Sequence, residues 1–204
     1  METPCWPGYG APVQGSFSTW VMDKARGIVI RLTRLGDTSL IVHWCTEEAG
    51  LLKTVAKGAR RAKSPFAGKL DLFVEADLVW LPSRKSELHI LKEVAVVEFR
   101  TELRRSYADT MLAAYFGQLL EKVVEREHPV PELFDLLRRA LSYLVNTPAD
   151  RRTLLHYERQ LAELLGVGNE GLNAGAALER AFGGLPGARS DCLALLGKDP
   201  GSAE

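Results

Sequence analysis

The sequence predicts an α+β protein in which a five-stranded OB-fold barrel precedes an all-α helical domain. The first observation is that residues 27–99 hold five short segments rich in β-branched and aromatic residues, separated by turn sequences. The second is that the apolar period lengthens after Phe99, from two residues to about 3.6. A sheet of this size would leave open edges unless it closed, and OB folds close in this way. An SH3-like barrel fits the strand count equally well.

The barrel is expected to begin with strands that pair in chain order. The five strands are expected at residues 27–33, 39–45, 51–56, 72–80 and 87–99. Gly36 and Asp37 separate the first two strands, and Gly50 separates the second from the third. Such residues form tight reversals, so we expect these three strands to pair antiparallel. A turn at Pro82 separates the last two strands.

Two long helices are expected after the barrel, each with one apolar face. The first should end near His128 and carry the apolar face Leu103, Tyr107, Met111, Leu112, Tyr115, Leu119 and Val123. The second should begin at Pro131, because proline suits the first helical turn. Its inward residues should be Leu133, Phe134, Leu137, Leu141 and Leu144.

A third helix is expected from the segment 147–150 to Gly166. Thr147 would cap it, Pro148 would take the first helical position, and Asp150 would lie in the first turn. Its inward residues should be Leu154, Leu155, Leu161, Leu164 and Leu165. One or two short helices are expected between residues 168 and 187, where several glycines interrupt the pattern.

These elements divide the chain into a tail and two domains. We expect a flexible tail at 1–22, the OB domain at 23–100, the helical domain at 101–197 and a frayed end at 198–204. Pro, Gly and Ser give the tail little to pack, and Met22 is a candidate start of the native chain. A tail that docks on the barrel through its tryptophans is the alternative. The tail lacks the pattern of a secretory signal, so a cytoplasmic protein is expected.

Composition narrows the function classes. The chain has 204 residues, 26 basic and 26 acidic, so only local clustering could favour nucleic acid. Cys5, Cys45 and Cys192 form no closely spaced pair, which predicts neither a disulfide framework nor a metal site. No catalytic constellation and no cofactor motif is found; the packed pair of His43 and Cys45 lacks a third activating group.

One basic segment stands out between the third and fourth strands. Together with its flanks it gathers six cations and no acid, namely Lys53, Lys57, Arg60, Arg61, Lys63 and Lys69. Its Gly58 and Pro65 predict a mobile loop, and a cationic loop beside a barrel suits the phosphates of a nucleic-acid strand. A solvated charge run is the ordinary alternative.

The segment 26–68 as a whole resembles the opening of RecO recombination proteins. The resemblance rests on a G-I-V strand, an L-G-D-T-S turn, a T-x-E-x-G hairpin and a basic loop reading K-G-A-R-R-x-K-S. It continues more weakly through LDLFVEADLVW, VVEFR and the first helix, and so covers residues 24–165. Many members carry a four-cysteine zinc module after the third helix, but only Cys192 follows Gly166, so a variant without zinc is expected.

The resemblance implies a non-enzymatic mediator of DNA recombination and repair at the nucleoid. It implies binding and annealing of single-stranded DNA, help in loading recombinase onto DNA coated by single-strand-binding protein, and RecR and that coating protein as partners. Only Lys57, Arg60, Arg61 and Lys63 carry over as DNA contacts from the family motif. Lys53 and Lys69 flank this loop, and we add Arg34, Arg84 and Lys85 because OB loops at these places border the ligand groove.

Other surface and core features leave alternatives open. Trp44, Phe66 and Trp80 are expected in the core, with base stacking as the alternative. Arg152, His156 and Arg159 form a helical stripe that could receive the acidic tail of single-strand-binding protein, although a solvated helix face is the ordinary and favoured explanation. An interaction scaffold with little DNA affinity and an RNA-binding OB protein are the competing functions.

Overall fold

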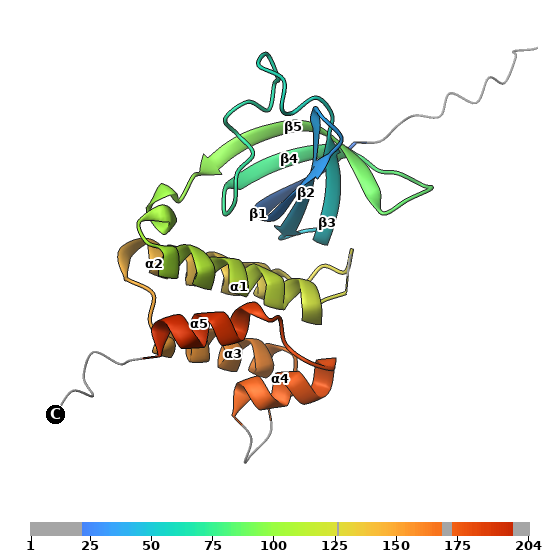
Figure 1. Cartoon of the computed structure of the whole chain (residues 1–204). Helices are drawn as coiled ribbons and strands as arrows, with labels where there is room; N and C mark the ends of the chain where they lie inside the picture. Colours follow the sequence, from blue (N-terminus) through green and yellow to red (C-terminus); the bar gives the residue numbers. More distant parts are fainter. Residues whose placement is uncertain (1–21, 126, 169–172, 198–204) are drawn as a thin grey trace, which may run out of the picture.

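The computed structural model describes residues 22–125, 127–168 and 173–197 and places a β-barrel above a group of helices (Figure 1). The expected tail and frayed end lie outside these residues, apart from Met22. The strands are β1 Asp23–Leu35, β2 Ser39–Thr46, β3 Gly50–Ala56, β4 Glu75–Leu81 and β5 Leu88–Glu98. The helices are η1 Thr101–Arg104, α1 Tyr107–Val123, α2 Pro131–Asn146, α3 Arg151–Leu164, α4 Ala174–Phe182 and α5 Ala188–Leu196.

The five strands form a closed barrel in the order β1-β2-β3-β5-β4, with β4 pairing back onto β1. The first three strands pair antiparallel in chain order, as predicted. The barrel closes through a parallel pairing of β3 with β5, in which Thr54 lies opposite His89. The α+β class and the five-stranded OB-like barrel are therefore confirmed, although no local signal indicated the parallel pair.

The inside of the barrel is filled by large apolar side chains. Val29, Trp44, Leu78 and Trp80 are buried there, and Phe66 reaches in from the loop after β3. The indole Nε1 of Trp44 donates to Thr54 Oγ1 at 2.9 Å, which satisfies its polar atom within the core. Trp44, Phe66 and Trp80 are therefore core residues, as expected, and the alternative of base stacking by them is wrong.

The outer face of β1, β2 and β3 packs against the helices. Ile30, Cys45 and Leu51 belong to the same buried cluster as Phe116 of α1. A Cβ atom at Gly117 would lie 3.1 Å from the Cβ of Ile30, so glycine lets α1 approach β1 closely. The helical domain thus covers part of the β2–β3 face, on which many OB folds bind their ligands.

The first helix is shorter than expected. Ser106 has extended backbone dihedrals and caps α1 by accepting a hydrogen bond from the Asp109 N–H at 3.0 Å. Leu103 consequently lies in η1, and Tyr107 is 70% exposed rather than on the apolar face. The helix ends at Val123, short of His128. The inward residues predicted for α2 are all buried.

The start of α3 also differs from the prediction. Asp150 is the cap, accepting from the Thr153 N–H at 2.7 Å, whereas Thr147 ends α2. Leu154 and Leu161 are buried as expected, but Leu155 and Leu164 are 41% and 45% exposed, because they lie at the edges of the buried face that Leu154 and Leu161 define. Two short helices, α4 and α5, follow in the described part of the chain, α5 beyond the expected range.

Candidate nucleic-acid interface

The basic loop after β3 is a chain of turns that is fixed to the barrel. The Gly58 N–H donates to Ser39 Oγ at 3.2 Å, and the Arg60 N–H donates to the Thr38 carbonyl at 2.9 Å. The Arg60 guanidinium donates to the Asp37 carbonyl at 2.8 Å, and Phe66 is buried in the barrel. The loop is therefore held against the β1–β2 turn, whereas the sequence suggested a mobile loop.

Three cations of the loop remain available to a ligand. Lys57, Arg61 and Lys63 are exposed, and none of them makes an ion pair or side-chain hydrogen bond within the described residues. Arg60 differs, because its guanidinium already holds the Asp37 carbonyl. Arg34 is exposed near the end of β1, opposite Leu40, and so belongs to the hairpin that anchors the loop.

The other predicted contacts are more scattered. Lys69 is half-buried in the turn that follows Phe66. Lys53 lies on the outer face of β3 opposite His43, in a small hollow beside α1, rather than with the loop. Its position follows from strand alternation, which turns it toward the helices.

Arg84 and Lys85 are exposed in the β4–β5 hairpin, which projects to one side while the basic loop rises above the barrel (Figure 1). The hairpin is fixed to the α1–α2 connection instead. The Ser83 N–H donates to His89 Nδ1 at 3.0 Å, and His89 Nε2 contacts Glu127 Oε1 at 3.2 Å.

A polar cluster that the sequence did not reveal joins the barrel to α1. His43 Nδ1 lies 2.8 Å from Glu121 Oε1, and Arg31 donates to the same oxygen at 2.8 Å. Burial alone would raise the pKa of Glu121, but the hydrogen bond from His43 and the charge of Arg31 together lower it. Neighbouring Cys45 is buried, and burial raises the pKa of its thiol to about 12. No local pattern could reveal this cluster, because its members are far apart in sequence.

The predicted stripe on α3 lines a groove. Arg152, His156 and Arg159 border a hollow of about 800 Å³ between α3 and α4, together with the exposed Leu155. The Arg159 guanidinium lies 3.1 Å from His156 Nδ1. Because Leu155 turns outward, the groove has an apolar wall beside its cations, which the sequence prediction did not include.

The described ranges 22–125, 127–168 and 173–197 contain neither a metal-binding group nor a membrane-spanning helix. No group of three or more His, Cys, Asp or Glu side chains there is arranged to hold a metal ion. No helix among these residues has the length and apolar character needed to cross a membrane.

The barrel, its anchored cationic loop and the packed helices define an OB-like protein with an appended helical domain. Residues 22–100 match the family model described as "Recombination protein O N terminal", and residues 104–171 match "Recombination protein O C terminal". The chain belongs to the RecO family, as its sequence motifs suggested.

Curated relatives agree with this assignment. The chain is 30% identical over 149 residues to a protein of Syntrophus aciditrophicus, 32% over 139 residues to one of Rhodopirellula baltica, and 32% over 158 residues to one of Haemophilus influenzae. Each is named "DNA repair protein RecO". The matches cover 73%, 68% and 76% of this chain but only 58%, 52% and 64% of the relatives, so the chain spans little more than half their length.

Proposed function

We propose that this chain is a non-enzymatic recombination mediator in DNA repair, acting in the cytoplasm at the nucleoid. It binds and anneals single-stranded DNA and assists recombinase loading onto DNA coated by single-strand-binding protein, with RecR as a partner. The observation that carries the proposal is the anchored loop that presents Lys57, Arg61 and Lys63 without partners among the described residues. Membership in the RecO family supports DNA rather than RNA as the polymer.

The anchored loop suits a phosphate backbone for two physical reasons. Its free cations release counterions when they bind phosphates, which favours binding at low salt. Its three anchoring hydrogen bonds and the buried Phe66 fix the loop before binding, so less conformational entropy is lost when a strand docks. The covered β2–β3 face also directs a ligand toward the loops at the end of the barrel.

The test is fluorescence anisotropy of a labelled single-stranded oligonucleotide at several salt concentrations. If the free cations Lys57, Arg61 and Lys63 each neutralise one phosphate, the logarithmic salt slope should be about −2, from roughly 0.7 per contact, and about −3 if Arg60 also contacts a phosphate. Arg61→Glu with Lys63→Glu leaves the loop anchors intact and should weaken binding roughly tenfold or more. Lys92→Glu with Arg180→Glu makes the same charge change on exposed sites elsewhere and should have little effect.

The competing functions predict other results. An oligonucleotide that stays unbound even at low salt would favour an interaction scaffold, and RecR and single-strand-binding protein would then be the ligands. Tighter binding of RNA than of DNA in direct competition would favour an RNA-binding OB protein.

The groove beside α3 supports a protein-binding role as well. Arg152, His156 and Arg159 would contact the carboxylates of the acidic tail of single-strand-binding protein, while Leu155 would contact its apolar residues. Arg152→Glu with Arg159→Glu should abolish binding of a labelled tail peptide and leave oligonucleotide binding by the loop unchanged. If the variant binds the peptide as tightly as the wild type, the stripe is an ordinary solvated helix face.

A further inference from the structure

A second cleft lies between the barrel and α2, away from the basic loop. It is an open hollow of about 580 Å³, lined by residues of β1, β4, β5 and α2. The loop after β3 rises on the side of the barrel opposite the helices, so the cleft and the loop are separate surfaces (Figure 1).

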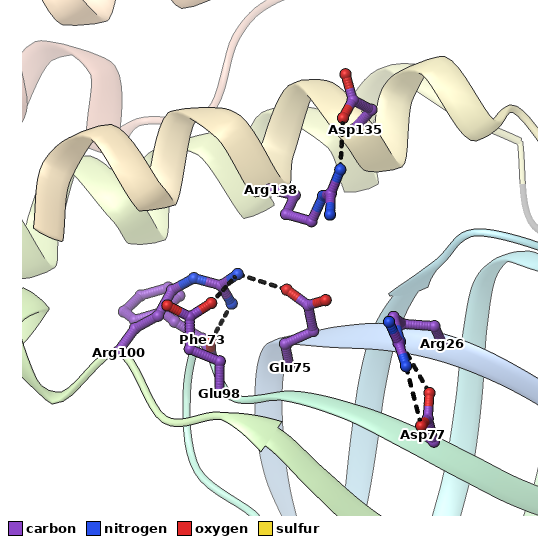
Figure 2. Close-up of polar contacts among 8 residues, drawn as sticks. All are labelled: Arg26, Phe73, Glu75, Asp77, Glu98, Arg100, Asp135 and Arg138. Carbon is purple, nitrogen blue, oxygen red and sulfur yellow. Dashed lines mark hydrogen bonds and ion pairs between the residues drawn. The ribbon is translucent and has the colours of Figure 1, made fainter.

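Arginines from both domains reach this cleft. Figure 2 shows Arg26 paired with Asp77 and Arg138 of α2 paired with Asp135. Arg139 of α2 pairs with the same Asp135 carboxylate. These side chains are 41–61% exposed, and exposed ion pairs contribute only about 0–1 kcal/mol. A phosphate could therefore replace Asp135 as the partner of one α2 arginine at little cost.

The floor of the cleft is a fixed polar group. The buried Arg100 guanidinium donates to the Phe73 carbonyl at 3.1 Å and pairs with Glu75 at 2.5 Å and Glu98 at 2.6 Å (Figure 2). Two carboxylates on one cation repel phosphates from the floor. Glu98 is half exposed, however, and an exposed carboxylate accepts hydrogen bonds from the amino groups of bases.

Apolar side chains face the cleft from opposite walls. Tyr143 of α2 is 50% exposed and Val97 of β5 is 48% exposed, and both line the hollow. An exposed ring next to arginines is the combination with which proteins bind single strands: bases stack on the ring and cations contact the backbone. The cleft is cationic at its α2 rim and acidic on its floor. This arrangement suits a strand whose phosphates lie at the rim and whose bases point toward the floor.

We propose that this cleft binds bases of single-stranded DNA as a second contact, with Tyr143 stacking on a base and Arg138 and Arg139 contacting the flanking phosphates. The inference rests on the proposed function and extends it, because the basic loop alone would hold one short stretch of strand. A chain with two separate contacts can hold a long strand across both domains, or two strands at once, as annealing requires.

The test compares two oligonucleotide lengths on the full chain by fluorescence anisotropy. A long single strand of about 30 nucleotides can reach both sites, whereas one of about 6 nucleotides occupies a single site. Tyr143→Ala should weaken binding of the long strand by about fivefold or more, the loss expected for one stacked base. Tyr143→Phe should restore binding, because it keeps the ring. Thermal unfolding of each variant checks that the fold is retained.

The arginines provide the second arm of the experiment. Arg138→Glu with Arg139→Glu should weaken long-strand binding and reduce the salt slope, while Lys92→Glu with Arg180→Glu should not. If both the Tyr143→Ala variant and the double arginine variant bind the long strand as tightly as the wild type, the proposal that the cleft binds DNA is overturned. A loss in Tyr143→Ala that phenylalanine does not restore would also overturn it.

The loop variant separates this failure from failure of the proposed function. If Arg61→Glu with Lys63→Glu abolishes binding while the cleft variants bind normally, DNA binding stands and the cleft proposal falls. If the wild-type chain binds neither oligonucleotide, the proposed function itself falls.

Discussion

At the scale of single residues, adjacent arginines in the basic loop have different surroundings. Arg60 holds the Asp37 carbonyl through its side chain and the Thr38 carbonyl through its main chain, whereas Arg61 extends from the loop without a described side-chain partner. From the sequence motif, both arginines were predicted to contact phosphates in the same way. The structure gives Arg60 an additional role in positioning the loop.

This difference predicts different effects on stability. Arg60→Ala removes one hydrogen bond that anchors the loop, so the free energy of unfolding should fall by roughly 0.5–1.5 kcal/mol. Arg61→Ala removes an exposed side chain and should change it by less than about 0.5 kcal/mol. Urea denaturation of both variants measures the difference, and equal values would show that the Asp37 contact does not anchor the loop.

The second prediction at this scale concerns Glu121. Its pKa is lower in the folded chain than its ordinary value, so its pairing with His43 and Arg31 stabilises the fold above the ordinary glutamate pKa. That contribution should be lost as the pH falls through the ordinary value and then the lowered one. Glu121→Gln should cost about 1 kcal/mol near neutral pH and make the acid limb of the stability curve shallower. Parallel curves for both proteins, measured by urea denaturation across acid pH, would contradict this prediction.

At the scale of elements, the β2–β3 hairpin and the α1–α2 connection meet backbone to backbone. Gly50 has a φ of +67°, and a Cβ atom there would lie 2.3 Å from the carbonyl oxygen of His128. The Glu127 N–H also donates to the Leu51 carbonyl at 3.1 Å. Glycine at position 50 therefore serves both the hairpin turn and the contact between the two domains.

Two matched glycines test this contact. Gly36 has a similar φ of +60° but nothing within 4 Å of its would-be Cβ, so Gly36→Ala should cost only the left-handed strain of about 1–2 kcal/mol. Gly50→Ala adds a backbone clash and should cost more, with a visibly lower Tm. A Tm shift no larger than that of Gly36→Ala would mean that the connection moves aside freely.

At the scale of the whole molecule, the barrel and helices share one buried cluster. Four buried side chains on the outer face of the barrel belong to the same cluster as the helices, namely Ile28, Ile30, Cys45 and Leu51. Residues 23–100 were expected to form the OB domain, and without the helices its apolar patch would face water.

A shortened chain that ends at residue 100 tests whether the barrel depends on the helices to cover its apolar patch. It should bind an apolar dye and scatter light at concentrations at which the full chain does not, because the patch on β1, β2 and β3 is uncovered. Replacing Ile28 and Ile30 by threonine in the short chain should reduce the scattering. A short chain that unfolds cooperatively and binds no dye would establish the barrel as an independent domain.

Features that depend only on neighbouring residues could be predicted from the sequence. Strand alternation, the change of period after Phe99 and the cation run around Arg60 are local, so the five strands, the α2 face and the basic loop were all predicted. Helix starts were harder to predict, because several residues near each start can cap: Asp150 rather than Thr147 caps α3. The sequence pattern also placed Leu155 on the inner face of α3, whereas it is 41% exposed at the edge of that face.

The way in which these elements meet could not be predicted, because it depends on contacts between distant segments. The parallel β3–β5 pair, the Glu121 cluster and the cleft under Tyr143 each join segments distant in sequence. Such contacts depend on packing and desolvation of whole faces, which no short window of sequence records. For this reason the sequence predicted a cationic loop on a barrel, while the anchoring of that loop and the second cleft emerged only once the helices were packed against the strands.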